Sequence, residues 1–217
     1  MKTIKGIWRF SRVICYTFVC LFQAYTRFKR VDRKEKGRML RYYPTQVLKL
    51  AGVRCSYEGN VPELLHECGL TDTPPAYMVL SNHISWLDIF SLDSQLPSRF
   101  IAKAEIAKWP VFGLIAQQIG TLFINRSSKR AILRINDDIR GALCNCEAVT
   151  IFAEGTTTFG NELLPIKANF IAPACEIGAT VQPVILSYKN KGKPTKRAAF
   201  AGDVTLFGSL WNVVTME

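Results

Sequence analysis

The segment Ser81-Asn-His-Ile-Ser-Trp-Leu-Asp88 contains the two side chains best suited to proton transfer. It directly follows the apolar run Tyr77–Leu80, so we expect His83 where a strand ends and Asp88 in the first turn of the next helix. A carboxylate there can accept the proton of one imidazole nitrogen, which leaves the other nitrogen free as a base. The positive end of the helix also disfavours imidazolium and so keeps His83 able to accept a proton.

A purely structural interpretation of this segment is also open. Ser85 and Asp88 have the spacing of a helix capping box, in which Asp88 only caps the helix and His83 only occupies a turn. The sequence shows no Ser or Cys nucleophile of recognisable context beside the pair. If the pair is catalytic, this favours a hydroxyl brought by the substrate over a covalent enzyme intermediate.

After residue 53, short apolar strands alternate with helical stretches. We predict strands over 77–80, 100–102, 121–124, 148–152 and 180–186. We predict helices over 86–96, 109–119, 129–143 and 169–177. This alternation predicts an α/β fold with a largely parallel central sheet flanked by helices. Functional residues of such folds lie in loops at the carboxyl ends of the strands, where His83 is expected.

The net charge of +11 is concentrated at the N-terminal end. Residues 1–50 hold 13 Lys or Arg against two acids, whereas the other 167 residues hold 15 basic and 15 acidic side chains. The mostly apolar run Val13–Phe22 lies among these charges but is shorter than the roughly 20 residues of a spanning helix. We therefore expect helices over 3–28 and about 31–51 that anchor the chain in a membrane surface. This predicts an anchoring segment, 1–51, before a domain of residues 52–217.

The basic, partly apolar N-terminal end is open to two other interpretations, and the sequence argues against both. A signal peptide would also have a basic start and a short apolar run, but no small-x-small cleavage site follows Phe22. The pI of 9.5 alone suggests nucleic-acid binding, and the apolar run and neutral remainder argue against it.

The seven cysteines are odd in number and lack metal-site spacing, so we predict buried thiols in a reducing compartment.

Three further segments follow the histidine motif in order: Gly120-Thr-Leu-Phe-Ile-Asn-Arg126, Phe152-Ala-Glu-Gly-Thr-Thr157 and Val181-Gln-Pro-Val184. With Asn82-His83 and Asp88 they form four ordered blocks. The sequence thereby resembles the glycerolipid acyltransferase family, which includes bacterial 1-acyl-glycerol-3-phosphate acyltransferases. The resemblance covers about residues 50–215 and implies a glycerolipid-acyltransferase-like α/β domain.

The resemblance also implies roles for individual residues. His83 would deprotonate the acceptor hydroxyl, which then attacks an acyl thioester, and Asp88 would orient the imidazole and stabilise its charged form. The acceptor would be bound by a group of six residues: Asn82, Arg126, Glu154, Gly155, Thr156 and Thr157. No metal or tightly bound cofactor is implied, because the acyl donor is a co-substrate carried by acyl carrier protein or coenzyme A.

The resemblance leads us to expect transfer to 1-acyl-glycerol-3-phosphate, which gives phosphatidic acid. The expected partners are the phospholipid bilayer, a lysophospholipid and the acyl thioester, without nucleic acid, at the cytoplasmic face of the cell membrane. Two departures from the family pattern, Ala153 for proline and Thr157 for arginine, leave an alternative acceptor open. Residues 154–167 are similar to family members that acylate lyso-ornithine lipid. A catalytically inactive membrane-bound binding protein is the other alternative.

The C-terminal end also departs from the family. The chain stops at Glu217, where relatives usually continue with another strand and helix. This indicates either a short protein or a fragment.

Overall fold

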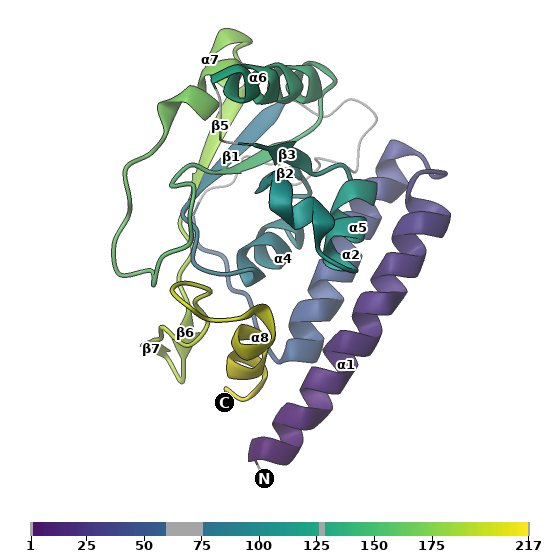
Figure 1. Ribbon diagram of the computed structural model, residues 1–217, viewed down its shortest axis with the longest axis vertical. Helices are drawn as coiled ribbons and strands as arrows, with labels where there is room; N and C mark the ends of the chain where they lie inside the picture. Colours follow the sequence, from purple (N-terminus) through teal and green to yellow (C-terminus); the bar gives the residue numbers. More distant parts are fainter. Residues whose placement is uncertain (1, 60–75, 126–128, 217) are drawn as a thin grey trace.

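The computed structural model of the protein describes residues 2–59, 76–125 and 129–216 (Figure 1). Its central sheet has five parallel strands in the order β3-β2-β4-β1-β5. The strands are β1 (Tyr77–Ser81), β2 (Arg99–Lys103), β3 (Leu122–Ile124), β4 (Val149–Phe152) and β5 (Thr180–Val184). In register, Ser81 of β1 lies beside Phe152 of β4 and Val184 of β5. The loops that leave these three strands therefore begin at the same edge of the sheet.

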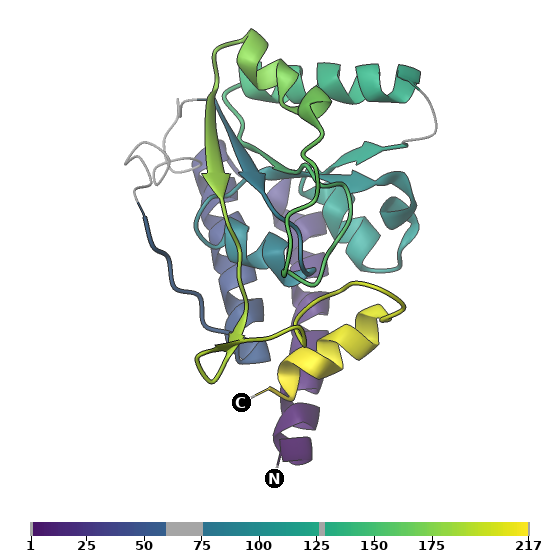
Figure 2. The ribbon, with the colours of Figure 1, turned by 90° about the vertical axis from the view of Figure 1, so that its left-hand side faces the viewer.

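Helices cover both faces of the sheet (Figures 1 and 2). Helices α6 (Lys129–Cys144) and α7 (Ala172–Glu176), with the 3₁₀ turn η3 (Ala168–Phe170), pack against one face around Met78. Helix α4 (Leu87–Asp93) packs against the other face, where Tyr77 and Val79 are fully buried. Successive residues of β1 thus enter opposite cores, as the strand pleat requires.

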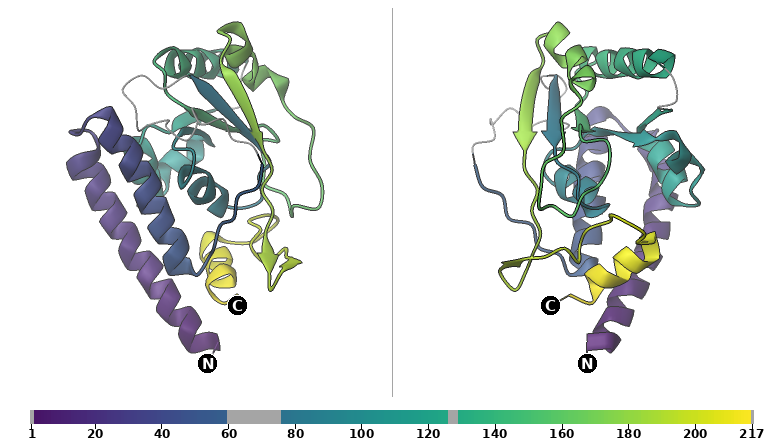
Figure 3. Two further views of the ribbon diagram at one scale, coloured as in Figure 1. Left: turned by 180° about the vertical axis from the view of Figure 1, so that it is seen from behind. Right: turned by 60° about the vertical axis from the view of Figure 1, so that its left-hand side comes forward.

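The N-terminal residues form an antiparallel helical pair (Figures 1 and 3). Helix α1 (Lys2–Gln23) continues into a π-helical turn, η1 (Ala24–Phe28), and the chain returns as α2 (Arg33–Ala51). Asp32 caps α2 by accepting a hydrogen bond from the Glu35 amide at 2.8 Å. Gly52 ends the helix at φ +81°, a conformation that glycine adopts without steric cost.

The helical pair shares a hydrophobic core with the rest of the protein. Val13 of α1 and Val47 of α2 are buried in one cluster with Leu87 of α4 and Leu210 of α8 (Leu206–Val214). The end of α2 coincides with the boundary predicted at residue 51, and the segments on either side of that boundary are packed together.

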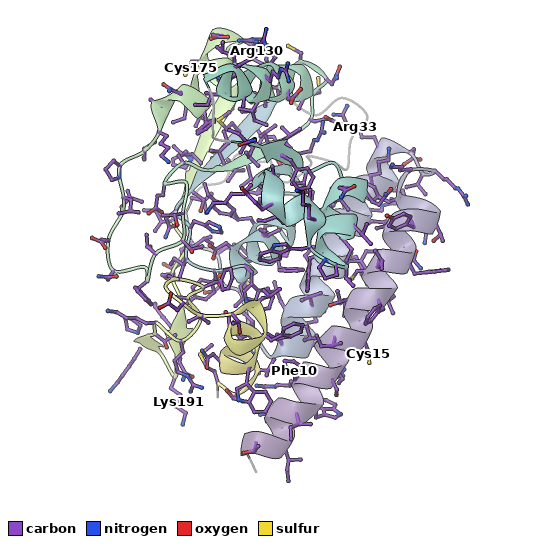
Figure 4. The ribbon with its side chains drawn as sticks, viewed as in Figure 1. Phe10, Cys15, Arg33, Arg130, Cys175 and Lys191 are labelled. Atoms are coloured by element: carbon purple, nitrogen blue, oxygen red, sulfur yellow. The ribbon has the colours of Figure 1, made fainter. Side chains whose placement is uncertain are left out.

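Side chains also tie the pair to the domain at two distant points. Near the start of α1, the Arg9 guanidinium donates to the main-chain oxygens of Val214 and Met216, at 3.2 and 3.0 Å. At the start of α2, Arg33, labelled in Figure 4, donates to the main-chain oxygens of the turn after α6. In Figure 4, Phe10 of α1 lies beside α8, where its ring contacts two aromatic rings of that helix.

The predicted α/β class, with a parallel sheet between helices, is confirmed. The predicted helix over 169–177 is instead two short pieces, η3 and α7, because Pro173 has no amide hydrogen and suits only a helix start. Four elements were not predicted: η2 (Ala104–Lys108), the hairpin β6 (Lys189–Asn190) and β7 (Lys193–Pro194), and α8. Helix α5 (Phe112–Gln118) lies within its predicted range. In the part of the chain that the structure describes, no helix combines the length and apolarity needed to cross a membrane.

The prediction that the cysteines are buried is wrong for the six thiols that the structure describes. Four are exposed, and the other two are half-buried; all six are free. Cys15 of α1 and Cys175 of α7 lie on distant parts of the surface (Figure 4). Cys68 lies outside the described residues.

Candidate active site

His83 and Asp88 form a hydrogen-bonded pair in the turn between β1 and α4. The imidazole Nδ1 lies 2.8 Å from Asp88 Oδ2, and the main-chain amides of Ile84 and Ser85 donate to the same oxygen at 2.6 and 2.9 Å. The ring of His83 stacks on Phe152 of β4, with centroids 3.9 Å apart and planes 8° apart. These contacts hold Nδ1 toward the carboxylate and leave Nε2 free to accept a proton.

The capping interpretation is only partly right, because Trp86, not Ser85, is the N-cap residue of α4. Asp88 accepts from the Ser85 amide, and Ser85 Oγ accepts from the Leu87 amide at 3.3 Å. The Asp88 oxygen that faces the imidazole of His83 therefore also holds the turn that leads into α4.

The second oxygen of Asp88 has a partner that the sequence did not indicate. The phenol of Tyr188 donates to Asp88 Oδ1 at 2.5 Å, from the segment that follows β5. Burial raises the pKa of the Tyr188 phenol well above its ordinary value, and the negative charge of Asp88 adds to this shift. The phenol is therefore protonated at neutral pH and remains a donor.

The turn that carries His83 is also held by its main chain. Glu154 follows β4, and its Oε1 accepts from the His83 amide at 2.9 Å. The carbonyl oxygen of His83 accepts from the Thr158 amide at 2.8 Å. The other carboxylate oxygen of Glu154 accepts from the Leu164 amide at 3.0 Å, so one buried side chain links the turn to the loop after β4.

Two further contacts hold the residues beside His83. The side-chain amide of Asn82 exchanges two hydrogen bonds with the main chain of Leu186, at 3.0 and 2.7 Å. The carbonyl oxygen of Ile84 accepts from the Phe200 amide at 2.8 Å. Each of these partners lies more than 100 residues along the chain, so the position of the imidazole depends on the whole fold.

A cavity of about 640 Å³ opens beside the pair. His83, Phe152 and residues 155–157 line the cavity. Apolar side chains of η1, α2, α4, β2 and α5 form most of its remaining wall. Its volume falls within the usual range for a small-molecule site, roughly 300–1,000 Å³. The cavity can therefore bring an apolar chain to the free nitrogen of His83.

The chain matches the Acyltransferase family over residues 55–187. It belongs to this acyltransferase family. It is 44% identical over 145 residues to the 1-acyl-sn-glycerol-3-phosphate acyltransferase of Neisseria gonorrhoeae, covering 66% of this chain and 56% of that protein. It is 40% identical over 138 residues to the lyso-ornithine lipid O-acyltransferase of Pseudomonas aeruginosa, covering 64% of this chain and 53% of that protein. The alignments thus span little more than half the length of these curated relatives.

A solved structure has the same fold. The crystal structure of the 1-acyl-sn-glycerophosphate (LPA) acyltransferase, PlsC, from Thermotoga maritima superposes with a TM-score of 0.60. The match covers 99% of this chain and 95% of that chain, at 17% sequence identity. Together with the family match, it confirms the resemblance that the four sequence blocks indicated.

The structure divides the predicted acceptor-binding residues of the chain into three groups. Gly155, Thr156 and Thr157 line the cavity, and Thr157 Oγ1 also donates to the Phe200 carbonyl at 2.5 Å. Asn82 and Glu154 instead make the main-chain contacts that hold the His83 turn, and their role in binding stays a prediction. Arg126 lies outside the described residues.

The residue pair suits general-base chemistry on a hydroxyl. Nε2 of His83 can take the proton, and the Asp88 carboxylate then faces the charged imidazolium across the 2.8 Å contact. Among the described residues, no group of three or more His, Cys, Asp or Glu side chains is placed to hold a metal ion.

Proposed function

We propose that the protein is an O-acyltransferase that moves a fatty acyl chain from an acyl thioester to the free hydroxyl of 1-acyl-glycerol-3-phosphate, which gives phosphatidic acid. The observation that carries this proposal is the hydrogen-bonded His83–Asp88 pair, whose histidine lines a largely apolar cavity. The name of the relative from Neisseria gonorrhoeae supports the same acceptor.

In the proposed reaction, His83 Nε2 removes the proton of the acceptor hydroxyl as its oxygen attacks the thioester carbonyl. The carbon–sulfur bond breaks when the tetrahedral intermediate collapses, and the imidazolium returns its proton to the departing thiolate. Asp88 keeps the imidazole oriented throughout and stabilises its transient positive charge. The cavity holds the acyl chain of the donor, whose burial among apolar side chains supplies binding energy.

Lyso-ornithine lipid is the second candidate acceptor, and Thr157 is the observation that favours it. Thr157 lines the cavity where the family pattern has an arginine, so this position has a hydroxyl in place of a cation that could bind a phosphate. The relative from Pseudomonas aeruginosa carries the name of this second activity.

We further propose that the protein works on the anionic, cytoplasmic face of a membrane, held there by residues 1–51. Helix α1 exposes large apolar side chains, among them Trp8, Phe18 and Phe22, while basic side chains lie on either side of Val13–Phe22. Apolar side chains inserted at the interface and cations near lipid phosphates both favour surface binding.

Acyl transfer by the purified full chain tests the activity. Oleoyl-coenzyme A and an oleoyl acyl carrier protein should each be tried with 1-acyl-glycerol-3-phosphate and with lyso-ornithine lipid. His83→Ala should lower kcat by about 10²- to 10⁴-fold in a protein that remains folded, because it removes the positioned base. If the protein transfers acyl groups to lyso-ornithine lipid in preference to 1-acyl-glycerol-3-phosphate, the second candidate acceptor is the substrate and the first is not. Absence of transfer to either acceptor would favour the inactive binding protein.

Flotation with vesicles that contain anionic lipid tests the location. Replacing Trp8, Phe18 and Phe22 together by Ser should release most of the protein, because these side chains are exposed on α1. Leu133→Ser and Leu163→Ser, at equally exposed apolar positions elsewhere, are the matched control and should leave flotation unchanged. Equal release by both sets would contradict a specific role for α1.

A further inference from the structure

We propose that Tyr188 is a positioning residue for the His83–Asp88 pair, because its phenol donates to the second carboxylate oxygen and holds Asp88 turned toward the imidazole. This inference rests on the proposed transfer chemistry, in which His83 must be neutral to act as a base. It adds to the four sequence blocks a residue that lies outside all of them.

The contacts of Asp88 divide between its two oxygens. Oδ2 receives the imidazole and the two main-chain amides, and Oδ1 receives the Tyr188 phenol at 2.5 Å. The Asp88 side chain is 0% exposed. Within the described residues, the phenol is the one hydrogen-bond donor recorded for Oδ1. Without that phenol, this oxygen would keep its charge in a buried site with no protein donor.

The segment that carries the phenol is held by several contacts besides the one to Asp88. Strand β5 lies next to β1 in the sheet, so the segment after β5 runs beside the His83 turn. Leu186 is bonded twice to Asn82, and the carbonyl oxygen of Tyr188 itself accepts from the Thr195 amide at 3.0 Å. The ring of Tyr188 packs against the cluster built from α1, α2, α4 and α8.

The charges around the phenol determine the effect of removing it. The titratable groups that face it are Asp88 of α4, with His83 bonded to that carboxylate, and the thiol of Cys55 in the segment after α2. A donor to a carboxylate favours its ionised form and spreads its charge. Loss of the donor concentrates negative charge beside the imidazole, so the pair binds its shared proton more tightly. His83 would then remain protonated, and inactive as a base, up to a higher pH.

Nuclear magnetic resonance of the full chain in lipid nanodiscs tests this effect without an activity assay. The chain has two histidines, so a His66→Gln background leaves the ¹⁵N-labelled imidazole of His83 as the single histidine signal. In Tyr188→Phe, the titration midpoint of His83 should rise by about one pH unit, as expected for loss of a bond to a charged group. An unchanged midpoint in the folded variant would overturn the proposal.

Tyr57→Phe is the matched control. The Tyr57 phenol also bonds α4, at the Ser91 carbonyl (3.2 Å) and the Ser94 hydroxyl (2.8 Å), but does not contact Asp88. This variant should leave the midpoint of His83 where it is in the parent protein. A shift equal to that of Tyr188→Phe would show that any lost bond to α4 suffices, and would also overturn the proposal.

Kinetics separate this inference from the proposed function. In Tyr188→Phe, the acid limb of the pH profile of kcat/KM should move to higher pH by about one unit, so that kcat/KM falls by up to about tenfold on that limb. If the wild type transfers no acyl group, the proposed function is wrong. The resonance titration would still show whether Tyr188 positions the His83–Asp88 pair.

If Tyr188→Phe does not fold, 3-fluorotyrosine at position 188 replaces it. Its more acidic phenol is a stronger donor and should lower the midpoint, and no change would overturn the proposal.

Discussion

Asp88 and Asp93 lie at the two ends of the same seven-residue helix, and their carboxyl groups have different surroundings. Both are almost fully buried, at 0% and 2% exposed. Four donors converge on Asp88, whereas Asp93 accepts a hydrogen bond from the Ser98 amide at 3.0 Å. Burial raises the pKa of Asp93 well above its ordinary value, and the Ser98 amide offsets only part of that shift.

The difference shows that burial alone does not decide whether a carboxylate is charged. Asp88 lies in the first turn of α4, where the helix dipole favours negative charge, and Asp93 lies at the end where it is disfavoured. Asp93 also lines the largely apolar cavity, where water solvates a charge poorly. Donors therefore converge on the carboxylate beside His83, whereas the surroundings of Asp93 favour a neutral carboxyl group at the cavity wall.

The largest effect should come from Asp88→Asn. The amide oxygen can still accept from the main-chain amides of Ile84 and Ser85, so the turn that leads into α4 is retained, but the negative charge beside His83 is lost. We expect kcat to fall about 10²- to 10⁴-fold and stability to fall by about 1–3 kcal/mol. Steady-state kinetics and urea unfolding measure the two separately. Near-normal kcat would mean that Asp88 only holds this turn.

Asp93→Asn should have an intermediate effect, and it should increase the free energy of unfolding where Asp88→Asn decreases it. Because the folded-state pKa of Asp93 is raised, the folded protein binds the proton more tightly than the unfolded chain. The wild type therefore loses stability as pH rises from the unfolded-state value, about 4, toward the raised value. The variant has no such group, so its unfolding free energy relative to the wild type should increase over this window.

Urea unfolding of the two proteins at several pH values measures that difference. The side-chain oxygen of the new Asn can still accept from the Ser98 amide, so the comparison isolates the charge. A difference that is constant with pH would show that Asp93 is equally protonated in the folded and unfolded states. The pKa of Asp93 would then not be raised by folding.

The smallest effect should come from Ser85→Ala, which removes one hydrogen bond to the start of α4 and leaves both carboxylates in place. Ser85 Oγ accepts from the Leu87 amide at a long 3.3 Å, and the Ser85 amide still donates to Asp88. We expect a loss of about 1 kcal/mol in the free energy of unfolding, a usual net value for one hydrogen bond. A loss as large as that of Asp88→Asn would show that the hydroxyl, and not the carboxylate, organises this turn.

Much of the fold was predictable because its signals are local. The strands over 77–80 and 148–152 are short apolar runs bounded by turns, and the structure places β1 and β4 there. Helix α8 was missed because it is short and includes Gly208 and Ser209, which are poor helix formers. Its remaining signal was Thr205, whose hydroxyl caps the helix by accepting from the Gly208 amide.

The candidate site also combines a local contact, which the sequence predicts, with contacts between distant residues, which it does not. The sequence by itself determined the His83–Asp88 contact, because the two residues are five apart and a strand, a tight turn and a first helical turn bring them together. It could not indicate Tyr188 or the role of Glu154, which are 100 and 71 residues from their partners. Those contacts were decided by the tertiary structure, because only the strand order places β1 between β4 and β5 and makes the loops after all three strands converge on one turn.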